Sequence, residues 1–168
     1  EKMLYDNALL ARTYGEAGHF LADPRWVGVA RATARYLVRE MQGPEGGFYS
    51  ARDADSQGEE GLFYLWTPEE VDEVLGAEAG ALFRDAYDVT PGGNFEGKSI
   101  PNLRRGLEAA ARSAGGPLEA LEEALSRSRT LLKEVRSRRE APFRDEKILV
   151  SWNAFALRAL AEAGAALG

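Results

Sequence analysis

The sequence contains no cysteine and a single histidine, His19, among its 168 residues. The absence of cysteine excludes disulfide bonds, thiolate catalysis and cysteine-bound metals. One histidine alone also argues against a histidine metal cage and a Ser-His-Asp triad. Any chemistry must therefore use carboxylates, amides, hydroxyls, lysine, arginine and aromatic rings, and we expect neither a cofactor nor a metal.

Long apolar runs and an excess of positive charge are also missing. No stretch approaches the roughly twenty apolar residues of a membrane span, and the first residues lack the order of a secretory signal. The formal net charge of -6 comes from 27 acidic and 21 basic residues, interspersed along the chain. We therefore expect a cytoplasmic protein that binds neither membranes nor nucleic acid. The length of 168 residues predicts about one domain, and the 45% hydrophobic content is enough for a real core.

Capping signals predict three helices. Asp23-Pro24 supplies an N-cap and a first-turn proline for an amphipathic helix that ends near Gln42. The capping box Thr67-Pro68-Glu69-Glu70 predicts a short helix that stops at glycine. A third, long helix follows Pro117, and its narrow apolar stripe indicates packing against one neighbouring helix.

Two further segments, Met3–Ala17 and Val150–Leu167, are apolar on most sides, which predicts helices that are buried nearly all round. The two segments also begin with similar sequences: Glu1–Ala8 matches Glu146–Ala154 with one residue inserted. Such self-similarity is typical of a repeated helical hairpin, although two alanine-rich helices can also match by chance. The fold class expected is therefore mainly α.

One segment, residues 43–66, has strand character. Gly46–Ser50 and Leu62–Trp66 are rich in aromatic residues and bounded by glycine, which predicts a β-hairpin. The acidic stretch Asp53–Gly61 would form its long tip.

Topology predicts that this hairpin and the two apolar helices meet. Short connections make consecutive helices antiparallel, so the hairpin should lie over the start of the first helix, and the start of the last helix should face the same end. The predicted catalytic residues are Asp53, Asp55 and Glu60. The predicted substrate-binding residues are Tyr5, Asp6, Asn7, Phe48, Tyr49, Trp66, Asn94, Lys147, Trp152 and Asn153.

This mixture of residue types favours a carbohydrate ligand. Aromatic faces cover the apolar faces of sugars, while carboxylates and amides bind their hydroxyls. Glycosidic cleavage needs two carboxylates at roughly 5 to 9.5 Å, but spacing in the sequence does not select a pair. A solvated acidic turn remains an alternative, as does a calcium loop starting at Asp53, although Tyr64 stands where an EF-hand has its bidentate glutamate.

Four motifs in order carry a family resemblance. They are Glu1–Ala8, Gly46–Ser56 continuing through Glu59-Glu60-Gly61 to Trp66, Gly93–Lys98, and Asp145–Leu149 with Ser151-Trp152-Asn153. Together they closely resemble the YyaL-like family, which includes spermatogenesis-associated relatives in animals and is often described as containing a thioredoxin domain.

The resemblance implies an N-terminal thioredoxin-like domain followed by a six-hairpin, glycosidase-like (α/α)6 toroid. Residues 1–168 would then form an incomplete toroid, about half of it, whose partners are the rest of the toroid and the thioredoxin-like domain. Unpaired helix faces would let the fragment self-associate. Together with the predicted site residues, this toroid leads to the hypothesis of a carbohydrate-active hydrolase or epimerase, with a non-catalytic scaffold or ligand-binding toroid as the alternative. The resemblance transfers no catalytic role to any position.

Overall fold

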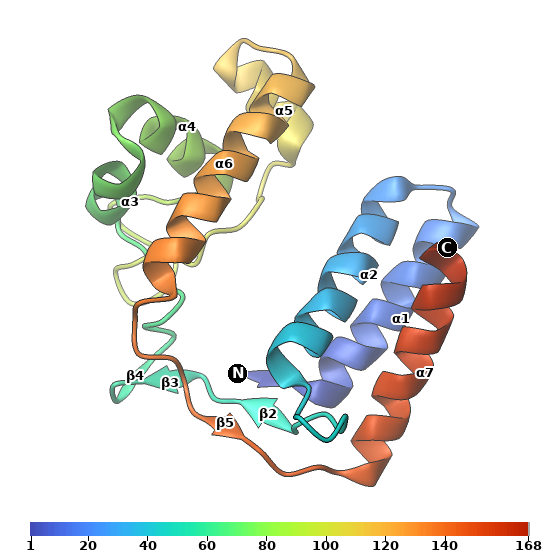
Figure 1. Ribbon diagram of the computed structural model, residues 1–168. Coiled ribbons are helices and arrows are strands. Elements are labelled where there is room, and N and C mark those ends of the chain that lie inside the picture. The colour runs from blue at the N-terminus through green and yellow to red at the C-terminus, as the bar shows by residue number, and fades with distance from the viewer. Residues whose placement is uncertain (168) are drawn as a thin grey trace. The chain divides into compact units, whose positions relative to one another are not determined.

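The computed structural model describes residues 1–167, and the side chains of residues 1–164. The chain is mainly helical, with short antiparallel strands, as the sequence predicts (Figure 1). It divides into two compact units. The first unit comprises residues 1–55 and the chain from residue 142 onward, and the second unit comprises residues 56–141.

Three helices form the body of the first unit: α1 (Leu4–Phe20), α2 (Pro24–Tyr36) and α7 (Val150–Leu167). α2 continues into one π-helical turn, η1 (Leu37–Met41). Figure 1 shows α1 in contact with both α2 and α7. The predicted cap is present, because the Asp23 carboxylate accepts a hydrogen bond from the backbone N–H of Arg25 at 2.9 Å.

Small residues make the contact between α1 and α7. Ala8, Ala11, Ala156 and Ala159 are all buried, which lets the two backbones approach closely. Several larger apolar residues of these helices, Leu9, Leu10, Phe155 and Leu157, are exposed, so the prediction of burial nearly all round is wrong for this chain. Leu157 on α7, for example, is 63% exposed.

Charged side chains link the same two helices. Glu162 of α7 forms ion pairs with Arg158, one turn earlier, and with Arg12 of α1, both at 2.8 Å. Arg12 also pairs with Glu16 at 2.8 Å. The hydrogen bond from Arg158, with smaller contributions from Arg12, lowers the pKa of Glu162.

A three-stranded antiparallel sheet lies at the starts of α1 and α7. Its strands are β1 (Lys2–Met3), β2 (Ala51–Arg52) and β5 (Arg144–Asp145), with β2 in the middle. Ala51 is opposite Met3 on one side and opposite Asp145 on the other. Each outer strand leads toward one of the two apolar helices.

The second unit contains α3 (Pro68–Leu75), α4 (Ala77–Tyr87), α5 (Leu107–Ala114) and α6 (Leu118–Arg136). Its hydrophobic core contains Trp66, Val71, Phe83 and Leu125, among other residues. The predicted capping box starts α3: Glu70 N–H donates to the Thr67 hydroxyl at 3.2 Å, and Thr67 N–H donates to the Glu70 carboxylate at 2.9 Å. The predicted long helix is α6.

The β-hairpin predicted over residues 43–66 differs from the one observed. Gly46–Ser50 and Leu62–Trp66 do not pair with each other; the acidic stretch between them forms its own hairpin, β3 (Asp55–Ser56) with β4 (Glu59–Glu60). The two residues of its turn, Gln57 and Gly58, have φ values of 56° and 79°. The aromatic segments are separated because Phe48 and Trp66 enter different hydrophobic cores.

Candidate functional site

Strand β2 and the residue before it bring together the starts of α1 and α7. The carbonyl of Ser50 accepts a hydrogen bond from the first amide of α1, Leu4 N–H, at 2.8 Å. The N–H and hydroxyl of Ser50 both donate to the carbonyl of Asp145, at 3.2 and 3.1 Å. The segment after α2 therefore lies at the start of α1, and the approach to α7 lies at the same end, as topology predicts.

Asn153, in the first turn of α7, fixes the neighbouring segment. Its side-chain carbonyl accepts from Phe48 N–H at 2.7 Å, and its amide donates to Phe48 O at 2.9 Å. The same amide donates to Leu149 O at 3.1 Å. Asn153 was predicted to bind substrate, but here its hydrogen-bonding groups hold the backbone.

Asn7 occupies the matching place on α1. Its amide donates to Met3 O at 2.7 Å, four residues earlier, which is the bond that Asn153 makes to Leu149. The internal similarity of the sequence thus has a structural counterpart, since equivalent asparagines in the first turns of neighbouring helices each donate to the carbonyl four residues earlier.

Of the predicted aromatic residues at this end, three are half-buried and one, Phe48, is buried. Tyr5 and Trp152 are half-buried and meet edge to face, with ring centroids 4.8 Å apart and an interplanar angle of 62°. Tyr49 is also half-buried, and the Arg144 guanidinium lies over its ring at 4.5 Å from the centroid. Phe48 is 3% exposed within the core, so the stacking role predicted for it is wrong.

The predicted carboxylates of the first unit, Asp6, Asp53 and Asp55, are exposed. Asp53 follows β2 directly, and its Oδ1 accepts a hydrogen bond from Ala54 N–H at 2.7 Å. Asp6 and Asp55 are exposed on α1 and β3. Among the described residues, no group of three or more His, Cys, Asp or Glu side chains is placed to hold a metal ion.

Asp145 is a charged residue of this site that was not predicted from the sequence. Its carboxylate pairs with the Lys147 ammonium at 3.0 Å and accepts from Lys147 N–H at 3.2 Å. The hydrogen bond from the Lys147 side chain is the main reason why the pKa of Asp145 is lowered. The spacing Asp145-x-Lys147, within the motif Asp145–Leu149, was the available signal. Lys147, predicted to bind substrate, is thus already ion-paired.

The remaining predicted residues, Glu60, Trp66 and Asn94, belong to the second unit. Glu60 is exposed in β4. Trp66 is 4% exposed and covered by the Arg139 guanidinium at 4.2 Å, so it is not available for the predicted stacking. Asn94 exchanges two hydrogen bonds with the backbone of Ile100, at 2.8 and 3.0 Å, which closes its glycine-rich loop.

No helix within residues 1–167 combines the length and apolar character that crossing a membrane requires. No protein-family model matches the chain. The chain is 35% identical to spermatogenesis-associated protein 20 of Homo sapiens over 193 aligned residues, covering 100% of this chain and 25% of the human protein. It is 33% identical to the Mus musculus protein of that name, again over 100% of this chain and 24% of the relative.

An uncharacterized protein of Caenorhabditis elegans is 29% identical over 97% of this chain and 26% of its own length. The chain therefore spans about a quarter of the length of the curated relatives it matches. These similarities support the relationship that the ordered motifs indicate: over its whole length, the chain is related to spermatogenesis-associated protein 20.

Proposed function

We propose that the starts of α1 and α7 form part of a carbohydrate-binding site, in a glycosidase-like or sugar-epimerase-like module built as an (α/α)6 toroid and located in the cytoplasm. The observation that carries the proposal is the half-buried pair Tyr5 and Trp152, with centroids 4.8 Å apart. Aromatic faces left partly open suit the apolar faces of a sugar ring. Tyr49 adds a third half-buried ring at this end of the first unit.

Polar groups next to these rings fit the hydroxyls of such a ligand. Asp6 follows Tyr5 on α1 and is exposed. The Lys147 ammonium is exposed as well, although it also pairs with Asp145. A polyol can exchange hydrogen bonds with both kinds of group, whereas an apolar ligand cannot.

Within this proposal, Asp53 is the first candidate for acid/base work, because it follows β2 directly and β2 joins the starts of α1 and α7. Asp55 is a further candidate in the first unit, and Glu60, also predicted from the sequence, belongs to the second unit. Glycosidic cleavage requires a second carboxylate at roughly 5 to 9.5 Å from the first.

The decisive experiment compares Trp152→Ala with Trp26→Ala in the intact protein. Trp26 is a matched control, because it also packs on a tyrosine, Tyr14, across two helices, at a centroid distance of 5.4 Å. Titration calorimetry against a panel of mono- and oligosaccharides should show binding that Trp152→Ala weakens about tenfold and Trp26→Ala leaves unchanged. An unchanged affinity in Trp152→Ala would overturn the proposed site.

Turnover is tested separately with Asp53→Asn, Asp55→Asn and Glu60→Gln. If sugar is bound and converted, at least one of these should abolish product formation while binding persists. Product formation that survives all three substitutions would exclude these carboxylates as the catalysts.

A second candidate function is a non-catalytic scaffold or ligand-binding toroid that serves a thioredoxin-like domain in a longer polypeptide. It is favoured by the use of three predicted binding residues, Asn7, Asn94 and Asn153, to hold the backbone. Under this alternative the protein binds sugars without converting them, or binds none. Product formation in a broad glycan screen would exclude it.

A further inference from the structure

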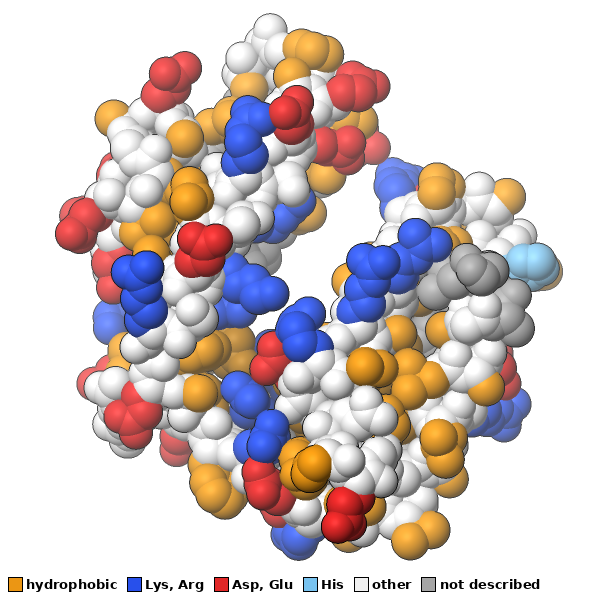
Figure 2. Space-filling view, in the orientation of Figure 1, with side chains coloured by type: hydrophobic (Ala, Val, Ile, Leu, Met, Phe, Trp, Pro, Cys, Tyr) orange, Lys and Arg blue, Asp and Glu red, His pale blue; other side chains and the backbone are white. Residues whose placement is uncertain are grey.

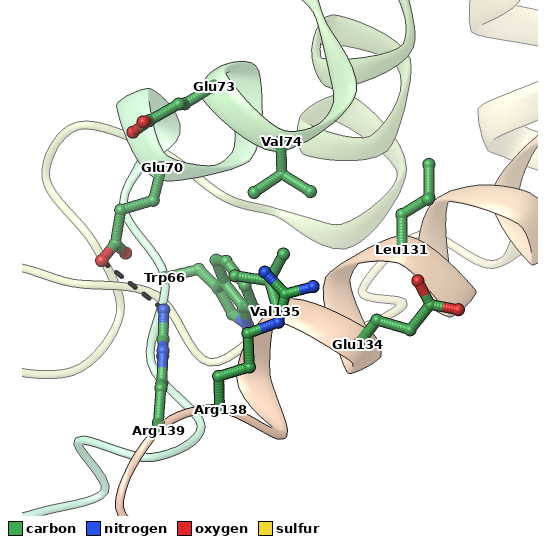
Figure 3. A pocket seen from close by; sticks show the side chains of 9 residues that line it. All are labelled: Trp66, Glu70, Glu73, Val74, Leu131, Glu134, Val135, Arg138 and Arg139. Carbon is green, nitrogen blue, oxygen red and sulfur yellow. Dashed lines mark hydrogen bonds and ion pairs between the residues drawn. The ribbon is translucent and has the colours of Figure 1, made fainter.

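A pocket of about 560 Å³ lies within the second unit, between α3 and α6 (Figure 3). Its apolar lining comes from Val74 on α3 and from Leu131 and Val135 on α6. Pockets for small organic ligands have volumes of roughly 300 to 1,000 Å³. The volume is therefore sufficient for a small ligand with an apolar group.

Two of the charged residues at the pocket, Arg139 and Glu70, already have partners within the protein. Arg139 donates to the carbonyl of Leu65 at 2.6 Å and lies over Trp66. Glu70 pairs with Arg139 at 3.5 Å and completes the cap of α3 by accepting from Thr67 N–H. These groups build the wall of the pocket, and Figure 3 shows Glu70 and Arg139 joined on one side of it.

Three other charged residues of the lining have exposed side chains: Glu73, Glu134 and Arg138. None of these three side chains forms an ion pair or a hydrogen bond with another residue that the structure describes. Glu73 comes from α3, whereas Glu134 and Arg138 come from α6 and its C-terminal turn. The pocket thus offers one guanidinium and two carboxylates around an aliphatic surface.

We propose that this pocket binds a small aliphatic zwitterion, of the class of free branched-chain α-amino acids. The guanidinium of Arg138 binds the ligand carboxylate, since arginine matches carboxylates with two parallel hydrogen bonds. Glu134, one turn before Arg138 on the same side of the pocket, binds the ammonium group, and Val74, Leu131 and Val135 contact the aliphatic side chain.

The charges select this class over simpler ones. A simple anion would meet Arg138 but also face two carboxylates, whereas a simple cation would leave the guanidinium unmatched. An uncharged apolar ligand would cover all three charges without compensating them. The proposal concerns residues of the second unit alone and is independent of sugar binding by the first.

The test uses four ligands that differ by one group each: L-leucine, 3-methylbutylamine, 4-methylpentanoate and glycine. Titration calorimetry or ligand-observed NMR on the intact chain should give saturable binding of leucine. Each of the other three should bind about tenfold more weakly or worse, since each lacks one charged contact or the apolar one. No saturable leucine binding, or equal binding of the amine, would overturn the proposal.

Two substitutions with matched controls connect this binding to the pocket. Arg138→Gln and Glu134→Gln should each weaken leucine binding about tenfold. Arg127→Gln and Glu122→Gln, at exposed positions of α6 outside the pocket, should leave it within about twofold. Thermal unfolding shows that each variant is folded. Equal losses in the α6 control variants would also overturn the proposal.

Discussion

The side chain of Asn153 satisfies both backbone groups of Phe48, accepting from its N–H at 2.7 Å and donating to its carbonyl at 2.9 Å. These two residues are 105 positions apart in the sequence. The contact therefore joins α7 to the segment that follows α2, and it orients the Phe48 ring into the core of the first unit.

Replacing Asn153 by alanine removes three hydrogen bonds and leaves both backbone groups of Phe48 without this partner. We expect a loss of about 1 to 3 kcal/mol in the free energy of unfolding. Asn7→Ala is the matched control, because it removes a single bond within one helix turn and should cost about 1 kcal/mol or less. Urea denaturation measures both, and equal losses would contradict the bridging role of Asn153.

The ion pairs of Glu162 predict an acid-sensitive contribution to stability. Its pKa is lowered in the folded chain, chiefly by the hydrogen bond from Arg158, so the unfolded chain takes up a proton more readily. The contribution is complete above the pKa of the unfolded carboxyl and disappears as the pH falls through the folded-state value. Glu162→Gln should thus be less stable than the parent chain at neutral pH and equal to it in strong acid.

Urea denaturation of both chains across the acid range tests this, with Glu122→Gln, an exposed residue of α6, as the control. The difference between Glu162→Gln and the parent must shrink as the pH falls. A difference that stays constant with pH would show that the ion pairs do not contribute.

The edge-to-face contact between Tyr5 and Trp152 predicts a coupling energy of about 0.5 to 1.5 kcal/mol. A double-mutant cycle with Tyr5→Leu and Trp152→Leu isolates it, because leucine keeps apolar volume while removing the ring. Additive effects of the two substitutions would show that the rings do not interact. The cycle is independent of any ligand.

The positive φ of Gln57, in the turn of the acidic hairpin, predicts a stabilising substitution. Gln57 holds φ at 56°, a conformation that costs residues with a side chain about 1 to 2 kcal/mol. Gln57→Gly should relieve part of this cost, raising the free energy of unfolding by up to about 1 kcal/mol. Gly58→Ala, at φ 79°, is the opposite control and should destabilise the chain.

Apolar side chains on the outside of α1 and α7 predict self-association. Leu9, Leu10, Phe155 and Leu157 are all exposed in the first unit. The space-filling view also shows hydrophobic side chains on the visible surface (Figure 2). Sedimentation velocity should show a coefficient that rises with concentration, and Phe155→Glu with Leu157→Glu should reduce the rise. A monomer at all concentrations would contradict this prediction.

The helices could be predicted from the sequence because their signals are local. The Asp23 cap, the box from Thr67 to Glu70 and the glycine that stops α3 all act within a few residues of the helix end. The sequence therefore located these helix starts closely. The α1 and α7 segments were also correct as helices, although their alanine-rich contact faces were mistaken for all-round burial. The helices α4 and α5 were not predicted from the sequence.

The strands and the site depended on distant partners, which local patterns do not contain. β2 is two residues long, and its neighbours in the sheet are the first residues of the chain and residues 144–145. The aromatic segments around Phe48 and Trp66 look like a hairpin but belong to different cores. Similarly, nothing next to Asn153 in the sequence reveals that its partner is Phe48.

The pairing of β2 with β5 closes the base of an insertion. The chain leaves the first unit after Asp55 and returns at Pro142, and Asp53 N–H donates to Phe143 O at 2.8 Å between these points. Backbone hydrogen bonds hold the exit and the return of the chain next to each other. Residues 56–141 therefore form an insertion whose two ends are fixed by the first unit. We expect that a short glycine-rich linker in its place leaves the first unit folded.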